Sequence, residues 1–153
     1  NPYSFEPPIA PHIAAQQAGI RIDPGVILNA ASELSSQADL LLVEGVGGWQ
    51  VPLDDALLLP DLVRVLDLPV ILVVGLRLGC INHALLTAES IRQGGFQLAG
   101  WVANAVDPDM DEPEAVVGAL KQRISEPMIG MVPYQTDLTM VSMQKTIPSL
   151  SSL

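Results

Sequence analysis

Four short, continuously apolar segments recur along the chain at a nearly constant interval, and this regularity restricts the possible folds more than any other feature. They cover residues 39–43, 69–74, 98–103 and 128–132. Because apolar residues follow one another without polar alternation, each segment predicts a strand buried on both faces, as in a parallel sheet between helices. The interval is close to the length of one βαβ unit. We therefore expect one α/β domain over residues 1–153, with a mostly parallel sheet and helices on both faces.

Helix signals occupy the intervals between these segments. Asp23-Pro24 places an N-cap residue before a Pro at the first helical position. Asn82 is expected to cap a second helix, which Gly94-Gly95 would end, and Asp111 is expected to open a third. The predicted helices run from Pro24 to before Asp39, from about 82 to 93 and from about 113 to 124, with weaker ones at 11–18 and 58–66. The Pro- and Ser-rich ends of the chain are expected to be irregular.

Charge and cysteine content exclude several classes of protein. Seven Lys plus Arg against seventeen Asp plus Glu give a net charge of -10, which disfavours binding to nucleic acid or to anionic membranes. Cys80 is the only cysteine, so the chain can form no internal disulfide, and a reducing cytoplasm fits best. The apolar runs are far shorter than the roughly 20 residues of a membrane span. We expect a cytoplasmic protein.

A carboxylate and three glycines follow the first apolar segment. Glu44 comes directly after it, and the next four residues are Gly45, Val46, Gly47 and Gly48. In an open parallel sheet, ligands bind beyond the carboxyl ends of the strands. A carboxylate there can hold Mg²⁺, and glycines let backbone N–H groups approach a phosphate. The alternative is a tight turn with a solvated Glu44, and the sequence leaves both open.

Two other places could carry binding chemistry. Asn104 ends the third apolar segment, where its amide could bind the edge of a base or could simply form a turn. Residues 79–82, Gly-Cys-Ile-Asn, open a predicted helix whose N–H groups could bind a carboxylate or phosphate, or could simply be capped. Cys80 has no base partner in the sequence that would make it a nucleophile.

The sequence contains no phosphate-binding loop of the form Gly-x-x-x-x-Gly-Lys-Ser/Thr. Its one Lys-Thr pair, Lys145-Thr146, is not preceded by glycines. We therefore expect the clamp on a nucleotide's phosphates to be missing from these residues.

Several motifs, in order along the whole chain, resemble the dethiobiotin synthetase family. They are Asn1-Pro-Tyr, Pro11-His-Ile, Val43-Glu-Gly-Val-Gly-Gly-Trp49, Gly79-Cys-Ile-Asn-His83 and Gly100-Trp-Val-Ala-Asn104. The resemblance implies a P-loop NTPase-like fold of the SIMIBI type and a homodimer. It also implies an enzyme that uses ATP and Mg²⁺ to make dethiobiotin from 7,8-diaminopelargonate and CO₂.

The resemblance also implies roles for single residues. Glu44 resembles the family's Mg²⁺ ligand and Asn104 its adenine-binding amide. The implied nucleotide-binding residues are Glu44, Gly45, Val46, Gly47, Asn104, Ala105, Pro133, Tyr134 and Gln135. The implied substrate-binding residues are Gly47, Gly48, Gly79, Cys80, Ile81, Asn82, Pro11 and His12. Glu44, the glycines and Asn104 are expected to line a single cleft.

The family's N-terminal strand, P-loop and catalytic lysines have no counterpart in the sequence. The chain therefore resembles the carboxyl-terminal portion of the family, with no catalytic residue of its own, and we expect it to be inactive alone. Two alternatives stay open. One is a non-catalytic substrate-binding or dimerisation module, and the other is another P-loop ATPase of the same superfamily, against which residues 79–83 argue.

Overall fold

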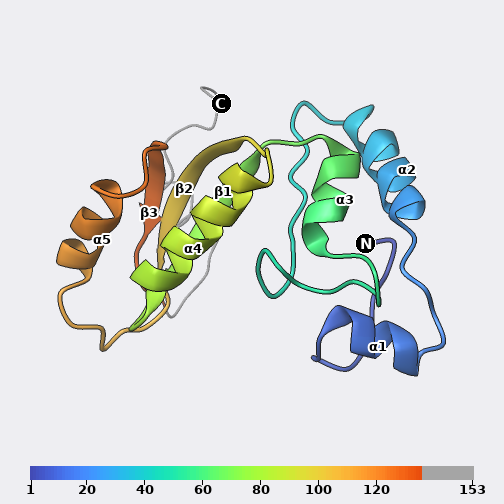
Figure 1. Cartoon of the computed structure of the whole chain (residues 1–153), viewed down its shortest axis with the longest axis horizontal. Coiled ribbons are helices and arrows are strands. Elements are labelled where there is room, and N and C mark those ends of the chain that lie inside the picture. The colour runs from blue at the N-terminus through green and yellow to red at the C-terminus, as the bar shows by residue number, and fades with distance from the viewer. Residues whose placement is uncertain (136–153) are drawn as a thin grey trace. The chain divides into compact units, whose positions relative to one another are not determined.

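The computed structural model describes residues 1–135, which belong to two compact units, the first covering Asn1–Leu68 and the second starting at Pro69 (Figure 1). The described residues form five helices and three parallel strands, so the α/β fold class is confirmed. In chain order these are α1 (Pro11–Gln17), α2 (Pro24–Ser35), α3 (Leu59–Leu66), β1 (Val70–Leu76), α4 (Cys80–Gln93), β2 (Leu98–Ala105), α5 (Pro113–Lys121) and β3 (Met128–Val132). The Ser-rich carboxyl-terminal stretch lies outside the described residues.

The second unit contains the sheet, with strand order β1-β2-β3 and parallel pairing throughout. Helix α4 connects β1 to β2, and α5 connects β2 to β3, so each connection is a βαβ crossover. The three later apolar segments of the sequence are therefore strands, as predicted. The register places Val73 opposite Val102 and Asn104 opposite Val132.

The core of the second unit lies between one face of the sheet and its two helices. Trp101 and Leu120 are completely buried there, together with Leu76, which is 1% exposed. Cys80 and Ala84 of α4 belong to the same cluster. Val73 points to the opposite face of the sheet and is 59% exposed. Within the described residues of this unit, apolar burial therefore holds α4 and α5 on a single face.

The first unit has a smaller core, formed by the buried residues Ala15, Ile22, Leu53 and Leu62. The predicted N-cap of α2 is confirmed, because the Asp23 carboxylate accepts a hydrogen bond from the Gly25 N–H at 2.8 Å. Helices α1 and α3 correspond to the two weaker predictions. No helix in residues 1–135 is both long enough and apolar enough to span a bilayer.

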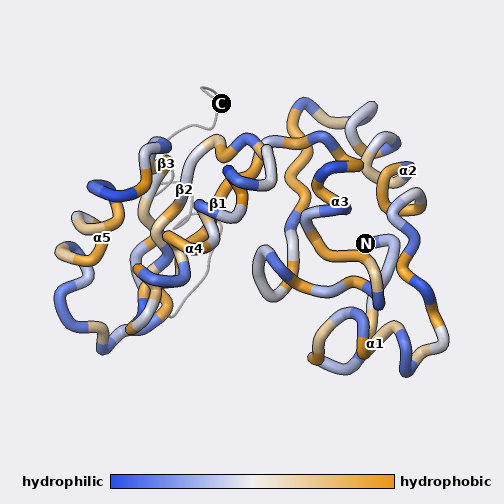
Figure 2. Tube along the Cα trace, viewed as in Figure 1, coloured by the Kyte–Doolittle hydropathy of each residue, from blue (hydrophilic) through white to orange (hydrophobic). Residues whose placement is uncertain are grey.

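The prediction of a strand at residues 39–43 is wrong for the structure described here. These residues are extended coil, and Leu40 and Leu42 are 60% and 66% exposed. A strand requires hydrogen bonds to a neighbour. The only strand-type pairing described within the first unit is an antiparallel bridge between Pro52 and Leu58. Figure 2 shows the hydrophobic stretch after α2 that suggested a buried strand.

Two predicted helix caps are also wrong. Helix α4 starts at Cys80, and Gly79 is the N-cap residue of this helix. Gly79 has a left-handed backbone with φ of 90°, which glycine adopts without strain, whereas Asn82 lies inside the first turn. Glu112, rather than Asp111, precedes α5, and it also has a left-handed backbone with φ of 51°. The end of α4 agrees with prediction, since Gly95 is left-handed with φ of 76°.

Candidate functional site

The carboxyl ends of the three strands bring together residues that are far apart in the sequence. Gly75 of β1 lies opposite Asn104 of β2, and Asn104 lies opposite Val132 of β3. Pro133 and Tyr134 directly follow β3, and Tyr134 is 46% exposed. The parallel register therefore places Asn104 next to the strand that leads into residues 133–135, all within the second unit.

Asn104 has the features of a binding amide. It is half-buried, and its side chain makes no hydrogen bond to another residue of the described chain. An amide offers both donor and acceptor atoms, so it can pair with a polar edge of a base. An exposed tyrosine ring such as Tyr134 can stack on a flat ligand. These groups could together hold a nucleobase at the sheet edge.

The glycine loop belongs to the first unit. Residues 44–48 are exposed, and Gly47 and Gly48 have φ of 75° and 123°, which only glycine adopts without strain. A Cβ at Gly45 would come within 3.1 Å of Leu59 Cδ2, and one at Gly47 within 3.2 Å of Val51 Cγ2. The backbone of this loop is therefore accessible, and its shape depends on glycine.

Glu44 is the carboxylate at the start of this loop, and it is exposed. No group of three His, Cys, Asp or Glu side chains within residues 1–135 is arranged to hold a metal ion. Mg²⁺ commonly binds through only one or two carboxylates, with water and phosphate oxygens completing its shell. A single Glu44 fits that kind of site. Glu44 and Asn104 belong to different units, so their sharing of one cleft stays a prediction.

The start of α4 contains the third group of predicted residues, Gly79, Cys80, Ile81 and Asn82. Cys80 is 5% exposed and its N–H donates to the Arg77 carbonyl at 3.0 Å, so the thiol belongs to the core. Asn82 is exposed on the first turn. An N-terminal turn presents N–H groups and a partial positive charge, which could receive an anion.

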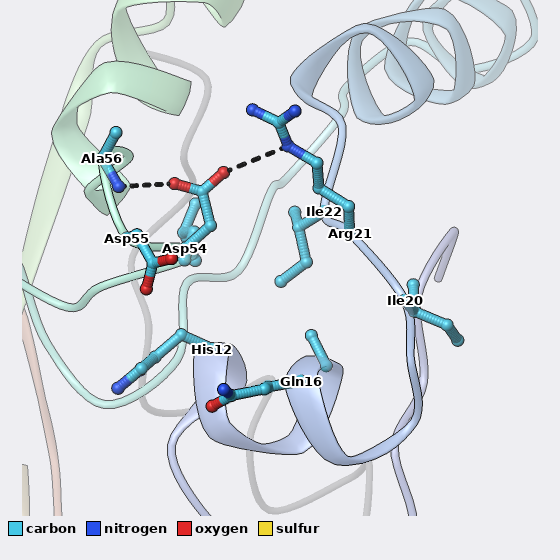
Figure 3. A pocket seen from close by; sticks show the side chains of 10 residues that line it. His12, Gln16, Ile20, Arg21, Ile22, Asp54, Asp55 and Ala56 are labelled. Carbon is cyan, nitrogen blue, oxygen red and sulfur yellow. Dashed lines mark hydrogen bonds and ion pairs between the residues drawn. The ribbon is translucent and has the colours of Figure 1, made fainter.

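His12 lies in a pocket that sequence reasoning did not identify. This pocket in the first unit has a volume of about 400 Å³ (Figure 3). Its polar lining comes from His12, Gln16, Arg21, Asp54 and Asp55, and its apolar lining includes Ala15, Ile22 and Leu53. The only signal in the sequence was the adjacent pair Asp54-Asp55, which loops commonly contain without binding anything.

Asp54 is fixed in this pocket by its neighbours. Its Oδ1 accepts hydrogen bonds from the N–H groups of Ala56 at 2.8 Å and Leu57 at 2.7 Å. The hydrogen bond from Ala56, with smaller contributions from Leu57 and Arg21, lowers the pKa of Asp54 below its ordinary value despite some desolvation. The carboxylate is therefore held in its charged form.

Comparison with known proteins gives a consistent result. A family model described as an AAA domain matches residues 1–142. The ATP-dependent dethiobiotin synthetase of Aromatoleum aromaticum is 54% identical over 134 residues, which are 88% of this chain and 60% of the relative. That of Nitrosospira multiformis is 55% identical over 134 residues, 88% of this chain and 59% of the relative.

A third relative, the ATP-dependent dethiobiotin synthetase of Pseudomonas aeruginosa strain UCBPP-PA14, is 52% identical over 140 residues, 91% of this chain and 61% of the relative. The chain thus spans about three fifths of the length of the curated relatives that it matches.

Proposed function

Because this chain belongs to the AAA-domain family and is similar to dethiobiotin synthetases over about nine tenths of its length, we propose that it is part of such an enzyme. The proposed reaction joins 7,8-diaminopelargonate and CO₂ into the ureido ring of dethiobiotin, in a cyclo-ligase step of biotin biosynthesis that consumes ATP. Identity of 54% over 134 residues is the observation that carries this proposal. We further propose that the enzyme is a cytoplasmic homodimer.

The nucleotide would bind along two groups of residues. Asn104 would bind the adenine edge through its amide, with Ala105, Pro133, Tyr134 and Gln135 around the base. The half-buried amide and its position beside β3 support this assignment. The glycine loop, residues 45–48, would lie along the phosphates and the reacting carbamate, because its accessible N–H groups can donate to oxyanions. Glu44 would hold Mg²⁺, which supplies positive charge to the phosphate oxygens.

The substrate would meet the start of α4. Residues 79–82 at the start of α4 would receive its distal carboxylate, across the interface of the dimer, through N–H groups other than that of Cys80, and Pro11 and His12 would lie near it. In the reaction itself, one amine carries CO₂ as a carbamate, whose oxygen is phosphorylated by ATP. The second amine then attacks the carbamoyl carbon, the ring closes, and phosphate leaves. Binding residues contribute by holding the two amines and the nucleotide in reacting geometry.

We propose that these 153 residues alone do not catalyse the reaction, since the sequence contains no P-loop. Phosphoryl transfer depends mainly on positioning and on charge stabilisation around the β- and γ-phosphates. Without that clamp, the chain would retain binding residues but no catalytic lysine. This same absence supports a second candidate function, a non-catalytic module that binds substrate or dimerises.

A chimeric protein tests the proposal. The portion of the Aromatoleum aromaticum relative that this chain does not match is joined to Asn1, and dethiobiotin formation is measured with ATP, Mg²⁺, bicarbonate and diaminopelargonate. The chimera is expected to form product, and the 153-residue chain is expected to form none. Glu44→Gln in the chimera should lower the rate at least about tenfold, whereas Glu33→Gln, an exposed change in α2, should not.

The possible failures have different meanings. Product from the 153-residue chain alone would overturn the proposed inactivity. A folded chimera that binds ATP but forms no dethiobiotin would overturn the enzymatic assignment. If the 153-residue chain is dimeric and binds diaminopelargonate without ATP, the non-catalytic module becomes the better description.

A further inference from the structure

We propose that Gly75 helps to select the nucleotide, because the bare backbone at this position lets a nucleobase lie on the carboxyl end of β1. This role rests on the proposed function, in which Gly75 has had no part. Gly75 pairs with Asn104 in the parallel register of β1 and β2 (Figure 1). Gly75 is therefore a direct neighbour of the residue whose amide is proposed to bind the base.

Gly75 and Asn104 lie on the same face of the sheet. Val74 and Leu76, on either side of Gly75, are 5% and 1% exposed and belong to the core beneath α4 and α5. Ala103, which precedes Asn104, is completely buried in the same core. Because successive residues of a strand point to opposite faces, positions 75 and 104 both face away from these two helices.

The described chain does not require a glycine at position 75. The φ of Gly75 is not positive, so other residues can adopt its backbone conformation. A Cβ there would lie 3.4 Å from Val106 Cγ2, which is an ordinary van der Waals contact. Gly100, in contrast, is required by packing, since a Cβ there would lie 2.7 Å from the Pro127 carbonyl oxygen. Within residues 1–135, neither backbone conformation nor packing therefore accounts for the missing side chain of Gly75.

A glycine inside a strand weakens that strand, and it often marks a place where a ligand approaches the backbone closely. Among the described residues of this unit, the face above β1 is uncovered, since Val73 is 59% exposed. A flat ring that is hydrogen-bonded to the Asn104 amide can extend over the neighbouring strand, which lies about 4.8 Å away. At a contact distance of about 3.5–4 Å, a methyl group on Gly75 would occupy the space between the ring and the backbone.

The groups around Gly75 indicate which kind of ligand approaches it. The Asn104 side chain is half-buried and makes no hydrogen bond to another residue of the described chain. A nucleobase offers a polar edge to this amide and a flat face to the bare backbone, so a single ring uses both features. Val106, which is 47% exposed, would add apolar contact beside the ring. A side chain at position 75 should therefore weaken binding of the base and leave binding of the phosphates unchanged.

The chimera described above tests this role, with ATP and inorganic tripolyphosphate as probes. Gly75→Ala should raise the Kd for ATP about tenfold and leave the Kd for tripolyphosphate, which has no base, unchanged. Gly118→Ala is the control, because it adds the same methyl group to α5 of the same unit, where a Cβ would meet nothing within 4 Å. The control should leave both dissociation constants unchanged. In urea unfolding without nucleotide, the Gly75→Ala chimera should be at least as stable as the unmodified chimera.

The contrary outcomes are distinguishable. Equal ATP affinity in Gly75→Ala and Gly118→Ala would overturn the role of Gly75 and leave the proposed function intact. A Gly75→Ala chimera that is less stable without nucleotide, or that loses affinity for both probes alike, would show that protein rather than the base fills this space, which also overturns the role. An unmodified chimera that binds no ATP would overturn the proposed function itself.

Discussion

The Arg92 guanidinium donates two hydrogen bonds to the Glu126 carboxylate, and this pair ties α4 to the segment that leads into β3. Nε donates to Oε1 at 2.8 Å, and Nη2 donates to Oε2. Ser125 Oγ lies within hydrogen-bonding distance of both side chains. Such a two-point contact orients the helix against the strand connection, as single surface ion pairs do not.

The Arg92–Glu126 pair should make stability depend on acid pH. The hydrogen bond from Arg92 lowers the pKa of Glu126 from 4.5 to about 2, so the folded state binds this proton less readily than the unfolded state. The stabilisation is present above pH 4.5 and is lost as pH falls towards 2. The Arg92 side chain is 38% exposed, so solvent screens its charge. We therefore expect the pair to contribute about 1 kcal/mol to the free energy of unfolding, which is less than the full pKa shift would give.

Denaturant unfolding of Glu126→Gln, followed by amide signals of the second unit, measures this contribution. The variant should be less stable at pH 7, and the difference should shrink as pH falls from 4.5 to 2. Glu114→Gln is the control, since Glu114 is exposed on the first turn of α5 and is not among the groups that act on Arg92. A difference between Glu126→Gln and the unmodified chain that does not change over this pH range would contradict the prediction.

Gly100 should be sensitive to the smallest substitution. A Cβ there would lie 2.7 Å from the Pro127 carbonyl oxygen and 2.8 Å from Ile129 Cγ1. Gly100→Ala should therefore destabilise the second unit by about 1–3 kcal/mol, because backbone must shift. Gly118→Ala provides the opposite case, since a Cβ at this position in α5 would meet nothing within 4 Å. Because Ala favours a helix more than Gly does, this variant should be more stable than the unmodified chain by about 0.5–1 kcal/mol. Urea unfolding of both variants checks the signs, and equal effects would refute the steric argument.

The cap of α2 should account for part of that helix's stability. Asp23→Ala removes the side-chain acceptor of the Gly25 N–H and should destabilise α2 by about 1 kcal/mol. Asp23→Asn keeps an acceptor of the same shape and should cost much less. Hydrogen exchange of the α2 amides distinguishes the two variants, and equal protection in both would show that the cap bond contributes little.

Under the proposed function, Asn104 should determine which base is preferred. In the chimera, Asn104→Ala should reduce the preference for ATP over GTP, measured as a ratio of kcat/KM, by about tenfold or more. Asn29→Ala, an exposed change in α2, should leave the ratio unchanged. An unaltered preference in Asn104→Ala would remove the adenine role from this residue.

Local patterns predicted most of the elements but only part of their arrangement. The capping signal of Asp23-Pro24 and the apolar runs that became β1, β2 and β3 depend on neighbours in the sequence, and these predictions were confirmed. The similarity to dethiobiotin synthetases, predicted from ordered motifs, was confirmed by the comparisons. Residues 39–43 failed as a strand because pairing requires a second strand, which an apolar run cannot reveal.

For this chain, the sequence by itself determined the α/β class, the glycine loop at residues 45–48 and the absence of a P-loop motif, since all three follow from residue types and their spacing. Only the tertiary structure placed Asn104 beside Gly75 and Val132. It also brought His12 to the Asp54–Asp55 loop in a single pocket. The physical reason is that strand register and cavity lining depend on contacts between distant segments, which hydrophobic packing selects during folding and local patterns do not encode.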